Sequence, residues 1–138
     1  MRLGCFRQIP ILTLHPPNAP APAAGYRNLA IVPVGRRLIV LAGQIGNLMD
    51  GSIVEGLEAQ YQQALSNIRE IVASEGGAPD DIARITVFLI EQPTNRELIQ
   101  KANKDAFPDG PPAMSWVYVA GLFRPDIKVE IEAIAAVE

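Results

Sequence analysis

The chain has 138 residues, of which 49% are hydrophobic, and this length can bury the core of one domain. Its net charge of -3 and sequence pI near 5.2 provide no positive surface for nucleic acid or anionic lipid. A single histidine, His15, and a single cysteine, Cys5, exclude an intrachain disulfide, a zinc site of ordinary composition and a two-histidine ribonuclease site, so we expect no metal and no cofactor.

We expect the first residues to be a non-targeting extension. Arg7, Gln8 and Pro10 interrupt any apolar run of signal-peptide length. No segment of the sequence approaches the roughly 18 apolar residues that cross a bilayer. We therefore expect a soluble, cytoplasmic protein that binds neither membrane nor nucleic acid.

An N-terminal arm over residues 1–18 is the first predicted element, and a single domain over residues 19–138 follows it. Five of the twelve prolines lie between Pro10 and Pro22. Proline resists helix and favours extended backbone. We expect the arm to lie on the domain or on a neighbouring subunit, with His15 facing solvent.

Two strands are predicted next, over residues 26–34 and 38–45. The short polar connection Gly35-Arg36-Arg37 is typical of a hairpin between them. The second strand is apolar on both faces, which predicts a position inside the sheet.

The middle of the chain alternates helix and strand. Apolar residues spaced three and four apart predict an amphipathic helix over residues 54–74, which Gly76-Gly77 ends. A strand over residues 84–90 follows, and Thr94-Asn95-Arg96-Glu97 matches a capping box at the start of a helix that runs to Ala106.

Two more strands, over residues 114–119 and 129–137, complete the pattern β-β-α-β-α-β-β. This order predicts an α+β fold, with a mixed β-sheet and two helices packed on one face.

Two carboxylates on the last strand are the first candidate functional groups. Glu130 and Glu132 are two residues apart, so they point to the same face of the sheet. They have either a chemical role or a plain structural one, on an exposed face or in an ion pair with Lys128.

The closing segment resembles a known signature. Pro112-Ala113-Met114-Ser115, then a strand, a loop and residues 129–135 (Val-Glu-Ile-Glu-Ala-Ile-Ala) are similar to the Pro-Ala-Arg-Ser and Val-Glu-Ile-Glu-Ala-Ile-Ala elements of the RidA (YjgF-type) enamine/imine deaminases. Further similar elements are Ala19-Pro20, Gly25-Tyr26, Ala42-Gly43-Gln44-Ile45 and Glu58-Ala59-Gln60. The resemblance spans residues 19–137, and it departs from the family where Met114 replaces the arginine.

The resemblance implies a chorismate-mutase-like fold and a homotrimer with small-molecule pockets in the clefts between subunits. In members that have the arginine, it grips the substrate carboxylate, while a glutamate and a backbone carbonyl position water to hydrolyse an enamine or imine. Carried over by position, the catalytic glutamate is Glu130 and the carbonyl belongs to Trp116. The substrate-binding residues are Tyr26, Met114 and Trp116.

Replacing arginine by Met114 removes two charge-assisted donors, each contributing about 1.5 to 3 kcal/mol. Losing both weakens a carboxylate ligand roughly a hundred- to ten-thousand-fold. Imines derived from amino acids are therefore poor substrates, unless another arginine such as Arg27 or Arg124 reaches the pocket.

Met114, Trp116 and Tyr118 share one face of their strand. They either line a pocket for a flat apolar ligand or fill the cleft as interface core. Two functions stay open: an imine deaminase-type hydrolase with a less charged substrate, and a non-catalytic trimer that binds a small molecule or a protein.

Overall fold

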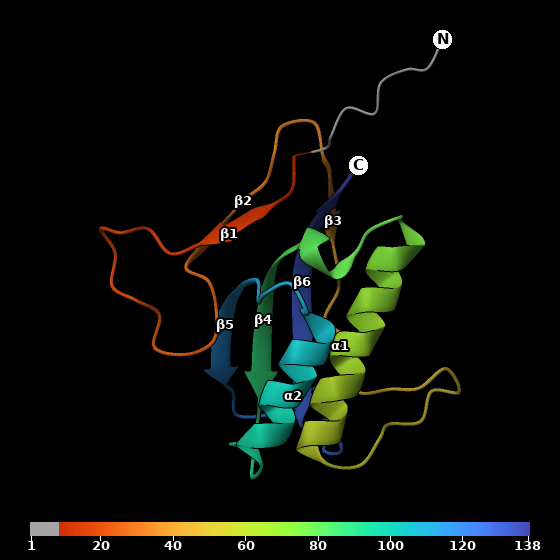
Figure 1. Ribbon diagram of the computed structural model, residues 1–138. Coiled ribbons are helices and arrows are strands. Elements are labelled where there is room, and N and C mark those ends of the chain that lie inside the picture. Colours follow the sequence, from red (N-terminus) through yellow and green to blue (C-terminus); the bar gives the residue numbers. More distant parts are fainter. Residues whose placement is uncertain (1–8) are drawn as a thin grey trace.

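The computed structural model describes residues 9–138, which form a helical layer on a mixed sheet (Figure 1). The helices are α1 (Leu57–Ser74) and α2 (Arg96–Ala106), and a short 3-10 helix, η1 (Pro79–Asp81), precedes the central strand. The strands are β1 (Leu12–Leu14), β2 (Leu29–Ile31), β3 (Arg37–Val40), β4 (Ile82–Leu89), β5 (Ala113–Tyr118) and β6 (Val129–Val137).

The predicted α+β class and the predicted order of elements are confirmed, with β1 as an additional strand. Four strands form the main sheet in the order β3-β6-β4-β5. The β4 and β5 strands run parallel and are joined through α2, whereas β6 is antiparallel to both of its neighbours. Both helices cover the same face of this sheet, and within residues 9–138 the other face carries no helix (Figure 1).

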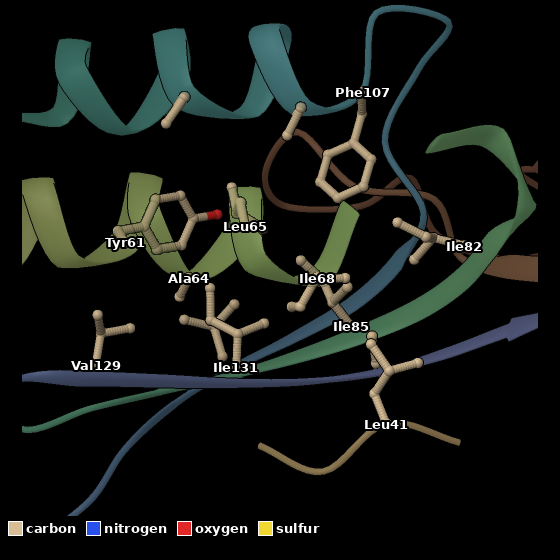
Figure 2. Packing of buried hydrophobic residues seen from close by; sticks show 14 of the residues in the cluster. Leu41, Tyr61, Ala64, Leu65, Ile68, Ile82, Ile85, Phe107, Val129 and Ile131 are labelled. Carbon is tan, nitrogen blue, oxygen red and sulfur yellow. The ribbon is translucent and has the colours of Figure 1, made fainter. Parts of the chain in front are cut away.

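The core lies between the helices and the sheet, and Figure 2 shows its packing. The apolar stripe of α1 supplies Tyr61, Ala64 and Ile68, all fully buried. Gly76, with φ of 82°, takes the left-handed conformation that ends α1, as the sequence predicts.

Strand β6 alternates between the two faces of the sheet. Val129, Ile131 and Ala133 are buried against the helices, and Glu130 and Glu132 therefore point to the opposite, open face. The prediction that both carboxylates share a face is correct.

The predicted hairpin between the strands over residues 26–34 and 38–45 is wrong. Strand β2 pairs with β1, whereas β3 pairs with β6 from Arg37–Val137 to Val40–Ile134. Pro33 has no N–H for a ladder, and β6 offers β3 a longer antiparallel partner.

The predicted interior position of the strand over residues 38–45 is also wrong. Strand β3 is an edge strand of the sheet, and its Leu38 and Val40 side chains are 65% and 70% exposed in the single chain. Apolar residues on both faces of a strand therefore did not signal coverage within one chain.

The start of α2 differs from the predicted capping box by one residue. Asn95 is the N-cap, and its Oδ1 accepts the Leu98 N–H at 3.2 Å. The Thr94 amide and hydroxyl instead donate to Glu58 of α1, whose carboxylate also accepts the Asn95 N–H at 2.9 Å. Glu58 competes successfully because α1 and α2 lie side by side.

Part of the predicted arm forms a strand. Residues Leu12–Leu14 pair with β2, and Ile11 and Ala30 pack against Ala83 and Ala136 of the main sheet. Residues 1–8, including Cys5, lie outside the described residues. Neither helix in residues 9–138 is both long and apolar enough to cross a membrane.

Candidate functional site

A large open cavity of about 770 Å³ runs along β5, the free edge of the sheet. Its walls come from three segments of the chain: residues 24–26 before β2, residues 92–103 at the start of α2, and residues 114–118 of β5. The predicted binding residues Tyr26, Met114 and Trp116 all line it. One cavity therefore unites three of the four predicted site residues.

Backbone pairing brings Tyr26 to this edge. The next residue, Arg27, donates its N–H to the Pro112 carbonyl at 3.2 Å and forms a parallel bridge with Ala113. The segment before β2 thus lies against the first residues of β5. Tyr26 is half-buried, and its hydroxyl accepts the Ala23 N–H at 3.4 Å.

Trp116 joins the cavity to the hydrophobic core. Its ring lies 5.6 Å from the ring of Tyr61, at a tilt of 48°. The Tyr61 hydroxyl donates to Asn103 Oδ1 at 2.5 Å, and burial raises the pKa of Tyr61, so the phenol stays protonated as a donor. Met114 and Trp116 are half-buried, with contact to the core and exposure in the cavity.

A charged lining residue of the cavity is Arg96, in the first turn of α2. The two arginines considered from the sequence lie elsewhere: Arg124 binds Asp126 through two nitrogens, and Arg27 donates to His15 Nε2 at 3.1 Å. Sequence reasoning missed Arg96 because it treated residues 94–97 only as a helix cap.

Glu130 lies on the open face, directly over Gly43. A side-chain Cβ at Gly43 would come within 2.1 Å of Glu130 Oε1, so any larger residue there would force the Glu130 side chain to move. The chain around Gly43 leaves the regular ladder: the Leu41 N–H donates to Ala133, and the next pairing is between Gln44 and Ile131. This bulge holds backbone beside the carboxylate.

The carboxylates of Glu130 and Glu132 have no hydrogen-bond or ion-pair partner within residues 9–138. The pairing with Lys128 that the sequence left open is absent, because the Lys128 Nζ lies 2.8 Å from Glu91 Oε1. Glu132 is exposed, whereas Glu130 is half-buried. Glu130 is therefore the more shielded carboxylate, with acceptor sites free for water.

A buried glutamine holds the loop that precedes β6, the strand that carries Glu130. Gln60 of α1 donates from Nε2 to the Asp126 carbonyl at 2.9 Å, and its Oε1 accepts the Lys128 N–H at 2.8 Å. Its side chain is 2% exposed, so both hydrogen bonds are shielded from water. The loop before β6 is thus anchored to α1.

A single chain does not bring Glu130 together with the other three residues. Strand β5 pairs with β4 so that Met114 lies beside Ile85 and Trp116 beside Val87. Met114 and Trp116 therefore lie on the helix-covered side of β5. Glu130 lies on the open side of β6, and β4 runs between β6 and β5. The carboxylate and the cavity are therefore on opposite faces of the sheet.

Comparison with known proteins assigns this architecture to a family. Residues 16–137 match the family described as Endoribonuclease L-PSP. A 2-iminobutanoate/2-iminopropanoate deaminase of Salmonella typhimurium is 35% identical over an alignment of 128 positions that covers 89% of this chain and 95% of that protein. A RutC family protein of Pyrococcus horikoshii is 32% identical over 86% of this chain and 91% of its own.

Solved structures agree with the sequence relatives. A Rid family protein of unknown function from Yersinia pestis superposes with a TM-score of 0.82 at 26% identity, over 94% of this chain and all of that one. The RidA of an Antarctic Psychrobacter gives a TM-score of 0.66 at 28% identity, over 91% and 99% of the two chains.

Proposed function

Because the chain belongs to the Endoribonuclease L-PSP (YjgF/RidA) family, we propose that it hydrolyses a reactive imine to a carbonyl compound and ammonia. The carrying observation is the half-buried Glu130, which has no partner in the described chain and lies against Gly43. The names of the deaminase relatives support the same reaction class.

The reaction needs a group that holds and orients one water molecule. Water adds to the carbon of the C=N bond and one of its protons passes to the nitrogen, which gives a carbinolamine. The hydroxyl proton of the carbinolamine then passes to the nitrogen as the C–N bond breaks, which releases ammonia and the carbonyl compound. We assign the water to the Glu130 carboxylate, which accepts its hydrogen bond and can take and return a proton. Atoms balance: imine plus water gives carbonyl plus ammonia.

Completing such a site requires a second copy of the chain. We propose a homotrimer in which the open face of one copy meets the β5 cavity of its neighbour, so that Glu130 faces a bound ligand. Leu38 and Val40 support this assembly, since both are apolar and largely exposed on that open face. Small-molecule clefts between subunits follow from this arrangement.

Met114 separates this chain from deaminases that bind small 2-imino acids through an arginine at that position. A thioether donates no hydrogen bond, so a carboxylate placed beside it is poorly solvated. We therefore propose that three- and four-carbon imino acids, which name the curated relatives, are weak substrates here.

The same substitution favours a second candidate function, a non-catalytic trimer that binds a small molecule or a protein. The two functions differ in whether the protein hydrolyses an imine. Imines generated in place from alanine or phenylalanine by an amino-acid oxidase provide the test, with semicarbazide trapping whatever imine is not hydrolysed.

The imine deaminase function predicts that the unmodified protein lowers the trapped imine from phenylalanine more than that from alanine. Met114→Arg should improve the alanine-derived reaction. Turnover that appears only in Met114→Arg, with none in the unmodified protein, would instead establish the non-catalytic alternative.

A further inference from the structure

We infer that Arg96 is the anion anchor of the β5 cavity, and that the ligand is a carboxylic acid with an aromatic or branched apolar body. The inference rests on the proposed function, because it names the substrate class of that same site. From Met114 alone, a carboxylate ligand is expected to bind weakly. The inference reverses that expectation, because the guanidinium that is missing from β5 is replaced by another one, which lines the same cavity from α2.

Charge in the cavity wall is concentrated at one residue. Among the lining residues of the described chain, Arg96 is the one with a charged side chain, and the remainder are amides, aromatic or apolar residues and a serine. Within the wall that one chain supplies, an anionic ligand group therefore meets a single attractive cation and no carboxylate.

The guanidinium of Arg96 is available for a ligand. It forms no ion pair and no side-chain hydrogen bond within residues 9–138, unlike Arg124, which is bound by Asp126. The nearby carboxylate of Glu58 is already engaged, since it accepts hydrogen bonds from Thr94 and Asn95. Both ends of the Arg96 fork remain open.

The helix itself adds positive charge at the position of Arg96. Arg96 is the first residue of α2, where the helix macrodipole places partial positive charge. A cation there is unfavourable alone and becomes favourable when an anion binds between it and the helix end. A carboxylate bound at Arg96 would relieve this repulsion.

The rest of the cavity fits an apolar body. Trp116 and Met114 form one wall and Ile99 of α2 lies in another, which suits a flat or branched hydrocarbon. A volume of about 770 Å³ is of the size that holds drug-sized ligands, and a four-carbon acid would fill only part of it. The anchor on α2, not on β5, therefore selects a longer acid.

Binding can be measured without turnover, by titrating the protein with unreactive probes. The probes are 3-phenylpropanoate, its neutral amide 3-phenylpropanamide, and butanoate. Trp116 is the one tryptophan of the chain, so its fluorescence reports binding in the cavity, and calorimetry gives the affinity. The variants are Arg96→Gln and the matched control Lys104→Gln, which removes an exposed charge from the same helix outside the cavity.

We expect 3-phenylpropanoate to perturb Trp116 emission and to bind the unmodified protein and Lys104→Gln equally. Arg96→Gln should bind it about two- to fivefold more weakly, since Arg96 is an exposed side chain. The amide should bind weakly to all three proteins, and butanoate more weakly than 3-phenylpropanoate. Matching melting temperatures confirm that Arg96→Gln folds.

Equal affinity of Arg96→Gln and the unmodified protein, equal binding of acid and amide, or no binding of the acid at millimolar concentration would each overturn the inference. The proposed function fails separately. Acid binding through Arg96 with no imine turnover refutes the enzyme alone, and turnover that is indifferent to Arg96→Gln refutes the anchor alone.

Discussion

The helix-covered face and the open face of the main sheet use the same four strands and bury very different amounts of side chain. On the covered face, Val129 and Ile131 are fully buried under α1 and α2. On the open face, Leu38 and Val40 stay largely exposed, and Glu130 and Glu132 have no partner in the described residues. Alternate residues of β6 thus serve stability on one side and, in the proposed function, chemistry on the other.

The difference between the two faces indicates where a functional site can lie in this fold. A face that is already packed offers little room for a ligand or a partner, except at its β5 edge, where the cavity opens. We propose that the exposed apolar side chains of the open face form an interface, and that the interface completes a site at the carboxylates, which have no partner in the described residues. The following predictions test this division of labour.

The largest expected effect is on catalysis at the open face. Glu130→Gln should lower imine turnover about 10²- to 10⁴-fold, because the amide cannot accept a proton from water. Glu132→Gln, two residues along the same face, is the matched control and should stay near the unmodified rate. Steady-state rates on the imine that the protein hydrolyses best provide the measurement, and equal losses in both variants would contradict the assignment.

Next comes the stability of the covered face. Ile131→Ala should lower the free energy of unfolding by about 2 to 5 kcal/mol, because it leaves a cavity under α1. Ile134→Ala removes a 37% exposed side chain from the open face of the same strand and should lower it by about 1 kcal/mol or less within a single chain. Urea unfolding at one fixed protein concentration compares them, and similar losses would erase the distinction between the faces.

Assembly through the open face gives the third prediction. Val40→Glu places a charge on an apolar, exposed side chain, so the fold should persist while the trimer dissociates. Light scattering after gel filtration measures the mass, and circular dichroism checks the fold. Met49→Glu, on an exposed loop, is the control that should leave the mass unchanged. A Val40→Glu protein of unchanged mass would argue against assembly through this face.

The smallest expected effect is on the pH dependence of stability, through the contact between α1 and the start of α2. The hydrogen bond from the Asn95 N–H, joined by those from Thr94, holds the pKa of Glu58 below its ordinary value. A lowered pKa contributes stability that is present above the pKa of the unfolded chain and is lost as pH falls through the folded one. Glu58→Gln should cost a few tenths to about 1 kcal/mol near pH 7, and the cost should shrink as the pH is lowered through the folded pKa of Glu58, as measured by urea unfolding at successively lower pH values. A constant difference across that range would contradict this linkage.

Local patterns in the sequence predicted most of the covered side. The three- and four-residue spacing of α1, the Gly76 stop and the alternation of β6 each depend on neighbours in the chain, so they could be read directly. Pairing partners depend on residues far apart. For that reason the sequence did not predict the pairing of β1 with β2, the edge position of β3 or the hydrogen bond from Asn95 to Glu58 at the start of α2.

The candidate site was predictable in part, for the same reason. Tyr26, Met114 and Trp116 were placed together by resemblance, and they do line one cavity. Arg96 was overlooked, because nothing in its local motif shows that the first turn of α2 packs beside β5. The catalytic role of Glu130 remains a prediction, and its separation from the cavity could not be read from residue order.

Mixing two defective proteins tests most directly the central claim that each site is shared between copies. Glu130→Gln lacks the carboxylate, and Tyr26→Ala is defective in the cavity, so each alone should be nearly inactive. Unfolded together in equal amounts and refolded, they should regain about a quarter of the unmodified turnover, because random trimers pair an intact open face with an intact cavity at that frequency. A mixture no more active than the mean of its two parents would contradict a shared site.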